Sequence, residues 1–527
     1  MAIELAAARV RGITPAEITR HLDRRFRLLT RGRRTAAARH QTLRNTIDWS
    51  YDLLDEPERT VLRRLGVFHA GFGLDAAEAV AADADLDAFE VMDLLVRLVD
   101  KSLVVAESRS GESRYRLLET IHDYAWERLE ESGELDHAAW RHARHYVELA
   151  VSAGSGLEGP DELVWRARVE DDLENLRAAL RWVVDQGDVD LALTEVEALN
   201  TVGSLRSPPF GLTALEVARM EGAEDHELYP MALASACMTE TQDGTVEHAL
   251  QLADAAEAAA ARLWTDSPRH RKLRCRLWGC LTTAIAYGGD FPRLTQLARG
   301  ELDDSRAIGD RFEMARALIL LSSVLGPEHD QEAIRYGEDA VALAKQIGNP
   351  SYQAWAPMML AGRLAASDPT RAETLLDEAV RAATVADNDF ARSQAVNQLA
   401  FTQAERGDYP AASRSLLDMT TMGRATGDRG TAMQGLIWLA CLLVLRGDEE
   451  GGIILGAWAE ERGFSVADTS PDARQYGVFG VGPYRASREA QSETARRAVS
   501  QQVASMDDAQ ILEFVRRRID TLSAAGR

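Results

Sequence analysis

A turn signature recurs at a nearly constant spacing through the second half of this 527-residue chain. It consists of the tetrads AIGD, QIGN, VADN and ATGD, which end at Asp310, Asn349, Asn388 and Asp428. These positions are 39, 39 and 40 residues apart, and related turns at Asp368, Asp408 and Asp448 alternate with them at steps of 40. A turn about every 20 residues leaves room for paired helices of about 16 residues. The spacing therefore predicts stacked helical hairpins, each of which buries its apolar face against its neighbours.

The array resembles divergent tetratricopeptide repeats. The segment GDYPAA at 407–412 is similar to the turn and second-helix start of that repeat, although the period exceeds the usual length of about 34 residues. Small residues indicate where helices approach closely, at Ala400, Ala412 and Ala440. Weaker copies extend upstream through Asp290 and Asp266. We predict a tetratricopeptide-like α-solenoid over 225–460, forming one curved superhelix.

The first part of the chain is predicted to be helical with one exception. Two short β-type runs, SLVVA at 102–106 and SRYRL at 113–117, flank a turn that contains glycine, which predicts a hairpin. Apolar residues at three- and four-residue spacing predict the surrounding helices, at 41–54, 56–68, 74–81, 88–101 and 118–131. Helices that lead into a two-stranded wing form a winged helix. The predicted fold class is therefore all-α, a winged helix with a small β-hairpin wing followed by the solenoid.

Charge is distributed unevenly. The chain has 60 basic and 83 acidic residues, a net charge of −23, whereas residues 1–45 hold eleven arginines and three acids, a net charge of +8. The acidic balance argues against nucleic-acid binding by the protein as a whole. The basic N-terminal stretch is either a solvated linker or a surface for an acidic partner.

The composition also indicates the cellular compartment in which we expect the protein. The sequence has no run of 18 apolar residues, so we expect no membrane span. Its four cysteines have no zinc-site spacing and are too few for a disulfide framework. We therefore expect a cytoplasmic protein.

Residues 1–200 contain blocks that resemble a known family. They include QTLRNTIDWSYDLLDEPERTVLRRLGVF, VMDLLVRLVDKSLVV, YRLLETIHDYAWERL and DLENLRAALRW. These blocks are similar to consecutive segments of the actinobacterial STAND (NB-ARC-like) predicted ATPases of LuxR-type and AfsR-like transcriptional regulators. The resemblance implies signal transduction, with a nucleotide domain followed by helical, winged-helix and repeat domains. It divides the chain into a remnant of the NB-ARC helical region (1–40), the winged helix (41–135), a helical linker domain (136–224), the repeats (225–460) and a C-terminal helical cap (461–527).

The sequence departs from that family because it contains no GxxxxGK[ST] phosphate-binding loop. None of its lysines, Lys101, Lys272 and Lys345, follows the glycines that such a loop needs. The stretch AIELAAARV resembles the tail of the block that closes the nucleotide domain. We therefore expect the part of the protein that follows the P-loop domain, through a truncated gene, a shortened start or a natural split. No enzyme activity, cofactor or catalytic residue is expected.

The function that follows is the non-catalytic regulatory or sensor portion of a STAND-type ATPase. We expect the repeats to bind an inducer, a protein or a peptide. Two alternatives stay open, a LuxR-like transcriptional regulator that contacts DNA and an ATPase completed by a missing P-loop half. An apolar stripe at Ile3, Ala6, Ala7 and Val10, beside the arginines, predicts self-association or a P-loop-bearing partner through residues 1–45.

Three groups of residues invite a functional interpretation. His122-Asp123 can be compared with the nucleotide-contacting MHD signature of related STAND proteins, but it lies one helical turn too late, so we expect an exposed helix pair. Among His137, His142 and His145, the last two can share a helix face, but no third ligand is evident, so we expect partly exposed histidines and no metal site. Cys275 and Cys280 are expected in the core.

DNA contact is disfavoured by the charge of the predicted recognition helix, 88–101. Arg97 and Lys101 are outnumbered by three acids, Glu90, Asp93 and Asp100. The C-terminal arginines 516–518 do not resemble a LuxR helix-turn-helix. Six aromatic residues in apolar helix patterns are expected to pack internally, namely Trp49, Tyr51, Trp126, Trp182, Trp355 and Trp438.

Overall fold

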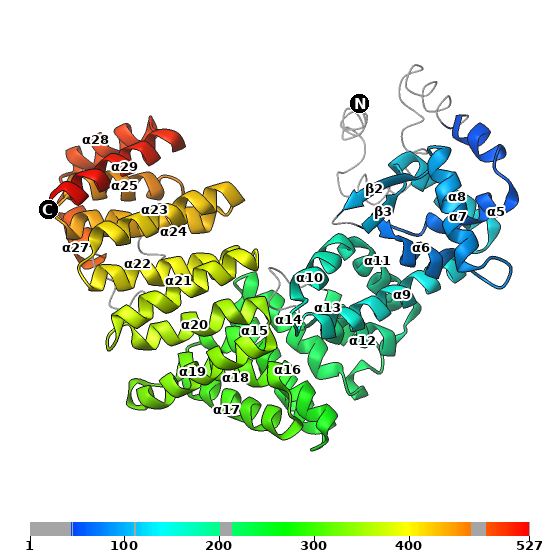
Figure 1. Ribbon diagram of the computed structural model, residues 1–527, viewed down its shortest axis with the longest axis horizontal. Helices are drawn as coiled ribbons and strands as arrows, with labels where there is room; N and C mark the ends of the chain where they lie inside the picture. Colours follow the sequence, from blue (N-terminus) through cyan, green and yellow to red (C-terminus); the bar gives the residue numbers. More distant parts are fainter. Residues whose placement is uncertain (1–43, 45, 110–111, 201–212, 465–480, 526–527) are drawn as a thin grey trace. The chain divides into compact units, whose positions relative to one another are not determined.

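The computed structural model describes residues 44, 46–109, 112–200, 213–464 and 481–525, whose elements are coloured along the chain in Figure 1. The chain forms two compact units, Met1–Ala150 with Arg168–Glu195, and Val151–Ala167 with Val196–Arg527. The predicted NB-ARC remnant at 1–40 and its apolar stripe lie outside the described residues. The other predicted domain boundaries stay predictions.

The first unit contains the winged helix. Its elements are α5 (Glu56–Leu65), β1 (Phe72–Gly73), α6 (Leu74–Ala81), α7 (Ala88–Asp100), β2 (Val105–Arg109), β3 (Glu112–Arg116) and α8 (Glu119–Ser132). The three strands form an antiparallel sheet in the order β1-β3-β2, in which Tyr115 of β3 pairs with Phe72 on one side and Ala106 on the other. Each of the helices α5 to α8 contributes buried residues to the core of this unit. The buried rings of Phe68 and Phe72 stack with centroids 4.1 Å apart.

The wing differs from the prediction in two ways. Strand β2, the first strand of the predicted hairpin, begins at Val105 and not at Ser102, because residues 102–104 reverse the direction of the chain. Ser102 has a φ of 59°, and the N–H groups of Leu103 and Val104 donate to the carbonyl of Leu98 at 3.0 and 3.3 Å. The two-residue strand β1 was not predicted, since two residues are too few to show an alternating pattern.

Helix α5 ends three residues earlier than predicted. Gly66 follows it where the backbone of α8 passes close, and a Cβ there would lie 2.8 Å from the Trp126 nitrogen. Only glycine permits this approach.

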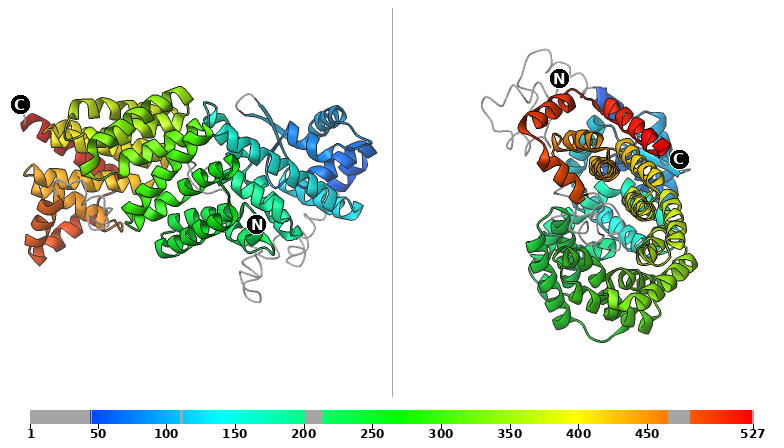
Figure 2. Two further views of the ribbon diagram at one scale, coloured as in Figure 1. Left: turned by 90° about the horizontal axis from the view of Figure 1, so that it is seen from below. Right: turned by 90° about the vertical axis from the view of Figure 1, so that its left-hand side faces the viewer.

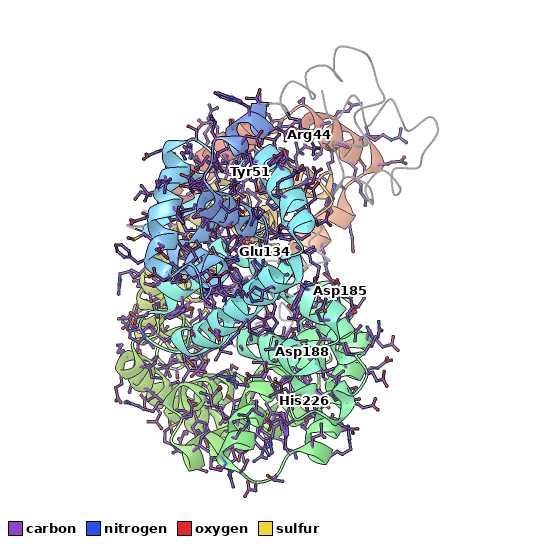
Figure 3. The ribbon with its side chains drawn as sticks, turned by 90° about the vertical axis from the view of Figure 1, so that its right-hand side faces the viewer. Arg44, Tyr51, Glu134, Asp185, Asp188 and His226 are labelled. Atoms are coloured by element: carbon purple, nitrogen blue, oxygen red, sulfur yellow. The ribbon has the colours of Figure 1, made fainter. Side chains whose placement is uncertain are left out.

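Of the first predicted helix, 41–54, the structure describes residues 44 and 46–54, and it is helical at 44 and over 46–52. Trp49 in this helix is 65% exposed, which corrects the expectation that it packs internally. Arg44 donates to Glu127 at 2.6 Å, and the ring of Tyr51 packs edge to face on Tyr124 at 5.4 Å; Figure 3 labels Arg44 and Tyr51 on this unit.

Further helices follow the wing. They are α9 (Leu135–Gly156), α10 (Glu162–Asp171), α11 (Leu173–Gln186), α12 (Val189–Asn200) and α13 (Thr213–Ala218). Asn175 of α11 fixes the loop before β1, because its Oδ1 accepts from the N–H of His69 at 2.9 Å and its Nδ2 donates to the carbonyl of Gly71 at 3.0 Å.

The repeats form six consecutive helical hairpins. These are α14 (Tyr229–Gln242) with α15 (Val246–Leu263), α16 (Pro268–Tyr287) with α17 (Phe291–Ile308), α18 (Arg311–Val324) with α19 (Asp330–Ile347), α20 (Pro350–Leu364) with α21 (Pro369–Val385), α22 (Asp389–Glu405) with α23 (Tyr409–Thr426), and α24 (Arg429–Leu445) with α25 (Glu449–Glu460). The predicted tetratricopeptide-like solenoid is confirmed. Its helices follow a curved path from green to orange in the right-hand view of Figure 2.

The recurring turn residues are helix N-caps. Each of the seven predicted Asp and Asn residues accepts a backbone N–H from the first turn of the following helix, as Asp310 does from Glu313 and Asn388 from Ala391. The glycine before five of them has the positive φ of a helix C-terminus, 70° at Gly309, 78° at Gly348, 81° at Gly407, 77° at Gly427 and 85° at Gly447. In the tetrad VADN, Asp387 takes the place of the glycine and has a positive φ of 45°. The signature thus ends one helix and begins the next.

In four of the six hairpins, α14/α15, α18/α19, α20/α21 and α22/α23, the first helix has the larger share of buried residues. Helix α20, for example, packs against its partner α21, against α19, and against the first helices α18 and α22. Ala400, Ala412 and Ala440 are at most 1% exposed, as predicted for close helix approach. The second helices α15, α19, α21 and α23 keep an exposed outer face.

The C-terminal helices complete the last core. They are α27 (Val481–Ala490), α28 (Glu493–Ala504) and α29 (Asp508–Ala525). Tyr484, Val503 and Ile511 join Trp458 and most of α24 in one buried cluster. This explains why the most apolar stretch of the sequence, within α24, is buried on all sides. No helix among the described residues is both long and apolar enough to cross a membrane.

Candidate functional site

The helix that a winged helix would place in a DNA groove is α7. A capping box starts it, in which the Asp87 carboxylate accepts the N–H of Glu90, and the Glu90 carboxylate accepts the N–H of Asp87. Its buried face, Val91, Leu94, Leu95 and Leu98, packs into the core. Its opposite face is open.

The basic side chains of α7 and of its C-cap, Arg97 and Lys101, are neutralised within the unit. Arg97 lies 2.7 Å from Asp55 and 2.8 Å from Glu58, and the Lys101 ammonium also contacts Glu58. The Glu58 side chain is 1% exposed, so these pairs draw both cations toward the start of α5. A backbone N–H from Glu58 and the Arg97 guanidinium hold the pKa of Asp55 below its usual value. Asp55 therefore stays charged and keeps Arg97 paired.

The open face of α7 carries no unpaired cation among its described residues. Phe89 and Val96 are 67% and 51% exposed, and Asp93 and Asp100 are exposed between and beyond them. Phosphate binding needs cations that can release counterions from the nucleic acid. An acidic and apolar face instead suits a contact with protein.

His122-Asp123 is half-buried, contrary to the expected exposed pair. His122 Nδ1 lies 3.6 Å from Asp123 Oδ1, and its ring meets that of His69 edge to face at 6.3 Å. Both histidines line a cavity of about 1220 Å³ in the first unit, together with Trp126, Arg116 and Arg181. Burial lowers the pKa of His69, so its imidazole is neutral at physiological pH. The loop before β1 brings His69 to this site, which sequence spacing did not reveal.

The other histidine cluster does not converge. His142 is 3% exposed and packs between Phe68 and Tyr146, which corrects the expectation of a partly exposed helix residue. Burial lowers its pKa to about 3. His137 is exposed, and His145 packs against Tyr146. Within the described residues, no three His, Cys, Asp or Glu side chains are grouped to hold a metal ion.

A buried ionic cluster in the repeats was not identified from the sequence. Arg316 of α18 lies 2.8 Å from Glu301 and 2.7 Å from Glu313, and both carboxylates are fully buried. Arg276 of α16 lies 2.8 Å from Glu158. Burial raises the pKa of Glu301 to about 7, although Arg316 opposes that shift. The signal for the cluster was the position of Glu301 within the apolar face of α17.

The basic stretch PRHRKLRC in α16 is also internally paired. Arg271 and Arg274 both contact Asp304 at 2.7 Å, and Lys272 contacts Asp310 at 3.0 Å. Cys275 and Cys280 are buried as predicted, and burial raises the pKa of both thiols. These residues stabilise the array and do not form a basic surface.

The first helices of the array also carry side chains suited to a partner. Trp355 of α20 and Phe390 at the start of α22 pack with ring centroids 5.9 Å apart, and Phe390 is 58% exposed. On α22, Asn397 Oδ1 and Gln398 Oε1 are buried without a hydrogen-bond partner in the described part of the chain. An exposed aromatic ring of this kind can be buried by a partner.

Comparison with known proteins agrees with this architecture. The family model described as "Winged helix-turn-helix domain" matches residues 54–130. These residues are a winged helix-turn-helix domain. The match begins just before α5 and ends within α8, so it includes α7 and the wing.

Two sets of mycobacterial relatives share sequence with the chain. A protein of Mycobacterium tuberculosis H37Rv named "Putative HTH-type transcriptional regulator" is 33% identical over 511 residues, which are 94% of this chain and 52% of the relative. A protein of the same organism with the name "Uncharacterized protein" is 45% identical over 159 residues, 30% of this chain and 40% of that protein. The chain thus spans about half the length of the regulator that it matches.

A solved structure shares the fold. It is a signal transduction ATPase with numerous domains (STAND) from Pyrococcus horikoshii, a protein with a tetratricopeptide repeat sensor. Its TM-score is 0.51 at 14% sequence identity, and the match covers 94% of this chain and 74% of that one.

Proposed function

We propose that this chain is the non-catalytic regulatory portion of a STAND-type signal-transduction ATPase. In this proposal its winged helix contacts protein, and its repeats bind an inducer or partner protein in the cytoplasm. The relatives named as regulators and the fold shared with a STAND protein support it. Assignment of residues 1–40 to an NB-ARC-like domain belongs to the same proposal.

The single observation that carries the proposal is the charge arrangement on α7. Arg97 and Lys101 are held by Asp55 and Glu58, while Asp93 and Asp100 face solvent. A phosphate backbone would meet negative charge at this helix. A protein surface can instead bury Phe89 and Val96, whose side chains are exposed in this structure.

The second candidate is a regulator that contacts DNA through α7. The winged helix-turn-helix match and the name of the mycobacterial relative favour it. An electrophoretic mobility shift with mixed-sequence DNA, over 50 to 200 mM salt, separates the two. We expect no shifted band at any salt concentration. A band that weakens with salt and disappears in Arg97→Ala would favour the DNA contact.

The repeats supply the binding function in this proposal. Trp355, Phe390 and the buried amide oxygens of Asn397 and Gln398 lie on two successive first helices. Bound peptide could cover the exposed ring of Phe390. The inducer would then be a protein or peptide.

We further propose that the chain itself does not hydrolyse ATP or GTP. The sequence has no GxxxxGK[ST], so no preorganised lysine and backbone cradle would stabilise the transferring phosphoryl group. Purified chain should show no phosphate release and no micromolar nucleotide binding by calorimetry. Turnover that a single substitution in this chain abolishes would contradict this. An ATPase completed by a P-loop-bearing partner stays the alternative, with the stripe from Ile3 to Val10 as its docking surface.

A further inference from the structure

The connection between α9 and α10 is seated on the helical repeats. It belongs to the second unit, in which residues 151–167 pack with the array. We call residues 157–162, LEGPDE, the acidic tip, because three of the six are acids. Leu157 is 1% exposed, and its carbonyl accepts the side-chain amide of Asn349 at 3.0 Å. The chain thus supplies a short acidic segment that occupies a surface of its own repeats.

The first carboxylate of the acidic tip is bound by two cations of α16. Glu158 Oε2 lies 3.0 Å from Lys272 Nζ, and Glu158 Oε1 lies 2.8 Å from a guanidinium nitrogen of Arg276. The Glu158 side chain is 15% exposed, so little water screens these contacts. Hydrogen bonds between such charged groups are among the strongest in proteins. This part of the repeat surface is therefore a carboxylate-binding site.

The second carboxylate of the acidic tip lies at the start of α20. Glu162 is 1% exposed. Its Oε2 accepts the N–H of Ser351 at 2.9 Å, and its Oε1 accepts the Ser351 hydroxyl at 2.5 Å. The first turn of a helix favours negative charge, because its N–H groups have no partner within the helix. A second carboxylate is thus bound four residues along the acidic tip from the first.

The groups that bind the acidic tip also have partners within the rest of the second unit. Lys272 contacts Asp310 at 3.0 Å, and Arg276 contacts Glu197. Asn349 keeps its role as the N-cap of α20 through its Oδ1. Departure of the tip would therefore leave neither cation buried and unpaired, which is the costly outcome for a buried ion pair. The acidic tip is an occupant that another molecule can replace.

We propose that the repeats recognise a partner protein through an acidic segment, and that the acidic tip holds this surface until the partner replaces it. The partner's segment offers two carboxylates at the spacing of Glu158 and Glu162. Since tip and partner use the same cations and the same helix end, only one of them is bound at a time. The inference rests on the proposed function, in which the repeats bind a protein or peptide, and it names the chemistry of that partner.

Fluorescence anisotropy tests this competition with a labelled peptide of residues 154–167, GSGLEGPDELVWRA, titrated with the full chain. The test variant is Glu158→Gln/Glu162→Gln, which weakens the hold of the chain's own tip. The matched control, Glu247→Gln/Glu449→Gln, removes two exposed carboxylates elsewhere in the repeats. A second labelled peptide carries glutamine at both tip positions.

We expect the test variant to bind the acidic peptide about 10-fold more tightly than wild type or control, because a tethered tip competes at high effective concentration. The glutamine peptide should bind the test variant about 10-fold more weakly than the acidic peptide, and 0.5 M NaCl should reduce that difference.

Equal affinity of wild type and test variant for the acidic peptide would overturn the proposal, as would the absence of binding by the test variant. Circular dichroism of the test variant should match wild type. Loss of helicity would also overturn the proposal, because the tip would then be a fixed part of the array. These outcomes do not depend on the DNA mobility shift that tests the proposed function, so either can fail alone.

Discussion

Whether a charged side chain of this protein is available to bind a ligand depends on the ion pair that it forms within the fold. In the basic stretch PRHRKLRC of α16, Arg271 and Arg274 both form ion pairs with Asp304. Arg97 is paired with Asp55, which is 42 residues away in the chain. Such pairings depend on how helices pack. A count of charges along α7 therefore predicted its net negative charge, but it could not show that Arg97 is paired with Asp55.

We expect Glu301 to make the stability of the repeats dependent on pH. Its pKa is raised to about 7 in the fold, from about 4.5 in the unfolded chain, so the folded state binds the proton more tightly. Its contribution is therefore present at low pH and is lost as pH rises from about 4.5 through 7. We expect the free energy of unfolding to fall by about 1–3 kcal/mol over that range from this residue.

The Glu301→Gln variant should flatten this dependence, because an amide cannot ionise but can still accept from Arg316. Chemical denaturation at pH 5, 6, 7 and 8 measures it. The exposed Glu247→Gln on α15 is the matched control and should behave as wild type. If Glu301→Gln keeps the full pH dependence, Glu301 does not titrate in this range.

Among the elements, the hairpin turns were the most predictable feature. Asp and Asn N-caps act through their own helix, so their spacing survives in the sequence without knowledge of packing. The wing was less predictable, because Leu103 and Val104 are buried in a chain reversal that hydrogen-bonds to the end of α7. Burial by tertiary packing there overrides the preference of β-branched residues for strands.

Replacing one N-cap should have a modest, local cost. The Asp368 carboxylate accepts the N–H of Arg371 at 3.1 Å and begins α21. Asp368→Ala should lower the free energy of unfolding by about 1 kcal/mol, while Asp368→Asn should remain within a few tenths. Urea denaturation followed by circular dichroism checks this. An alanine variant as stable as wild type would mean that another group caps α21.

Deleting one whole hairpin should preserve the array. Residues 388–427 comprise the N-cap of α22 through the glycine that ends α23, so their removal brings Asp428 to the position that Asn388 held. We expect normal helical circular dichroism per residue. Removing only 388–407 leaves α23 without its partner and should unfold part of the array. Two deletions with equal, cooperative unfolding would contradict the repeat register.

For the whole molecule, the sequence predicted the order of architectures but not the site. The helical periods and the wing implied a winged helix before a solenoid, and both are present. The position of His69 beside His122, and the exposure of Trp49 and Phe390, follow from contacts between segments far apart in the chain. Local sequence patterns indicate which face of one helix or strand is buried. They cannot show which distant segment packs against that face, or whether any does.

The charges of α7 and of the segment that pairs with it should close the winged helix to DNA. Fluorescence anisotropy of a labelled mixed-sequence duplex, titrated with full chain at 50 and 200 mM salt, tests this most directly. We predict no binding by wild type, and salt-dependent binding by Asp93→Arg/Asp100→Arg, which places two unpaired cations on the open face of α7. Asp339→Arg/Asp377→Arg is the matched control for added charge in the repeats. Tight, steeply salt-dependent binding by wild type that Arg97→Ala and Lys101→Ala weaken would contradict the account.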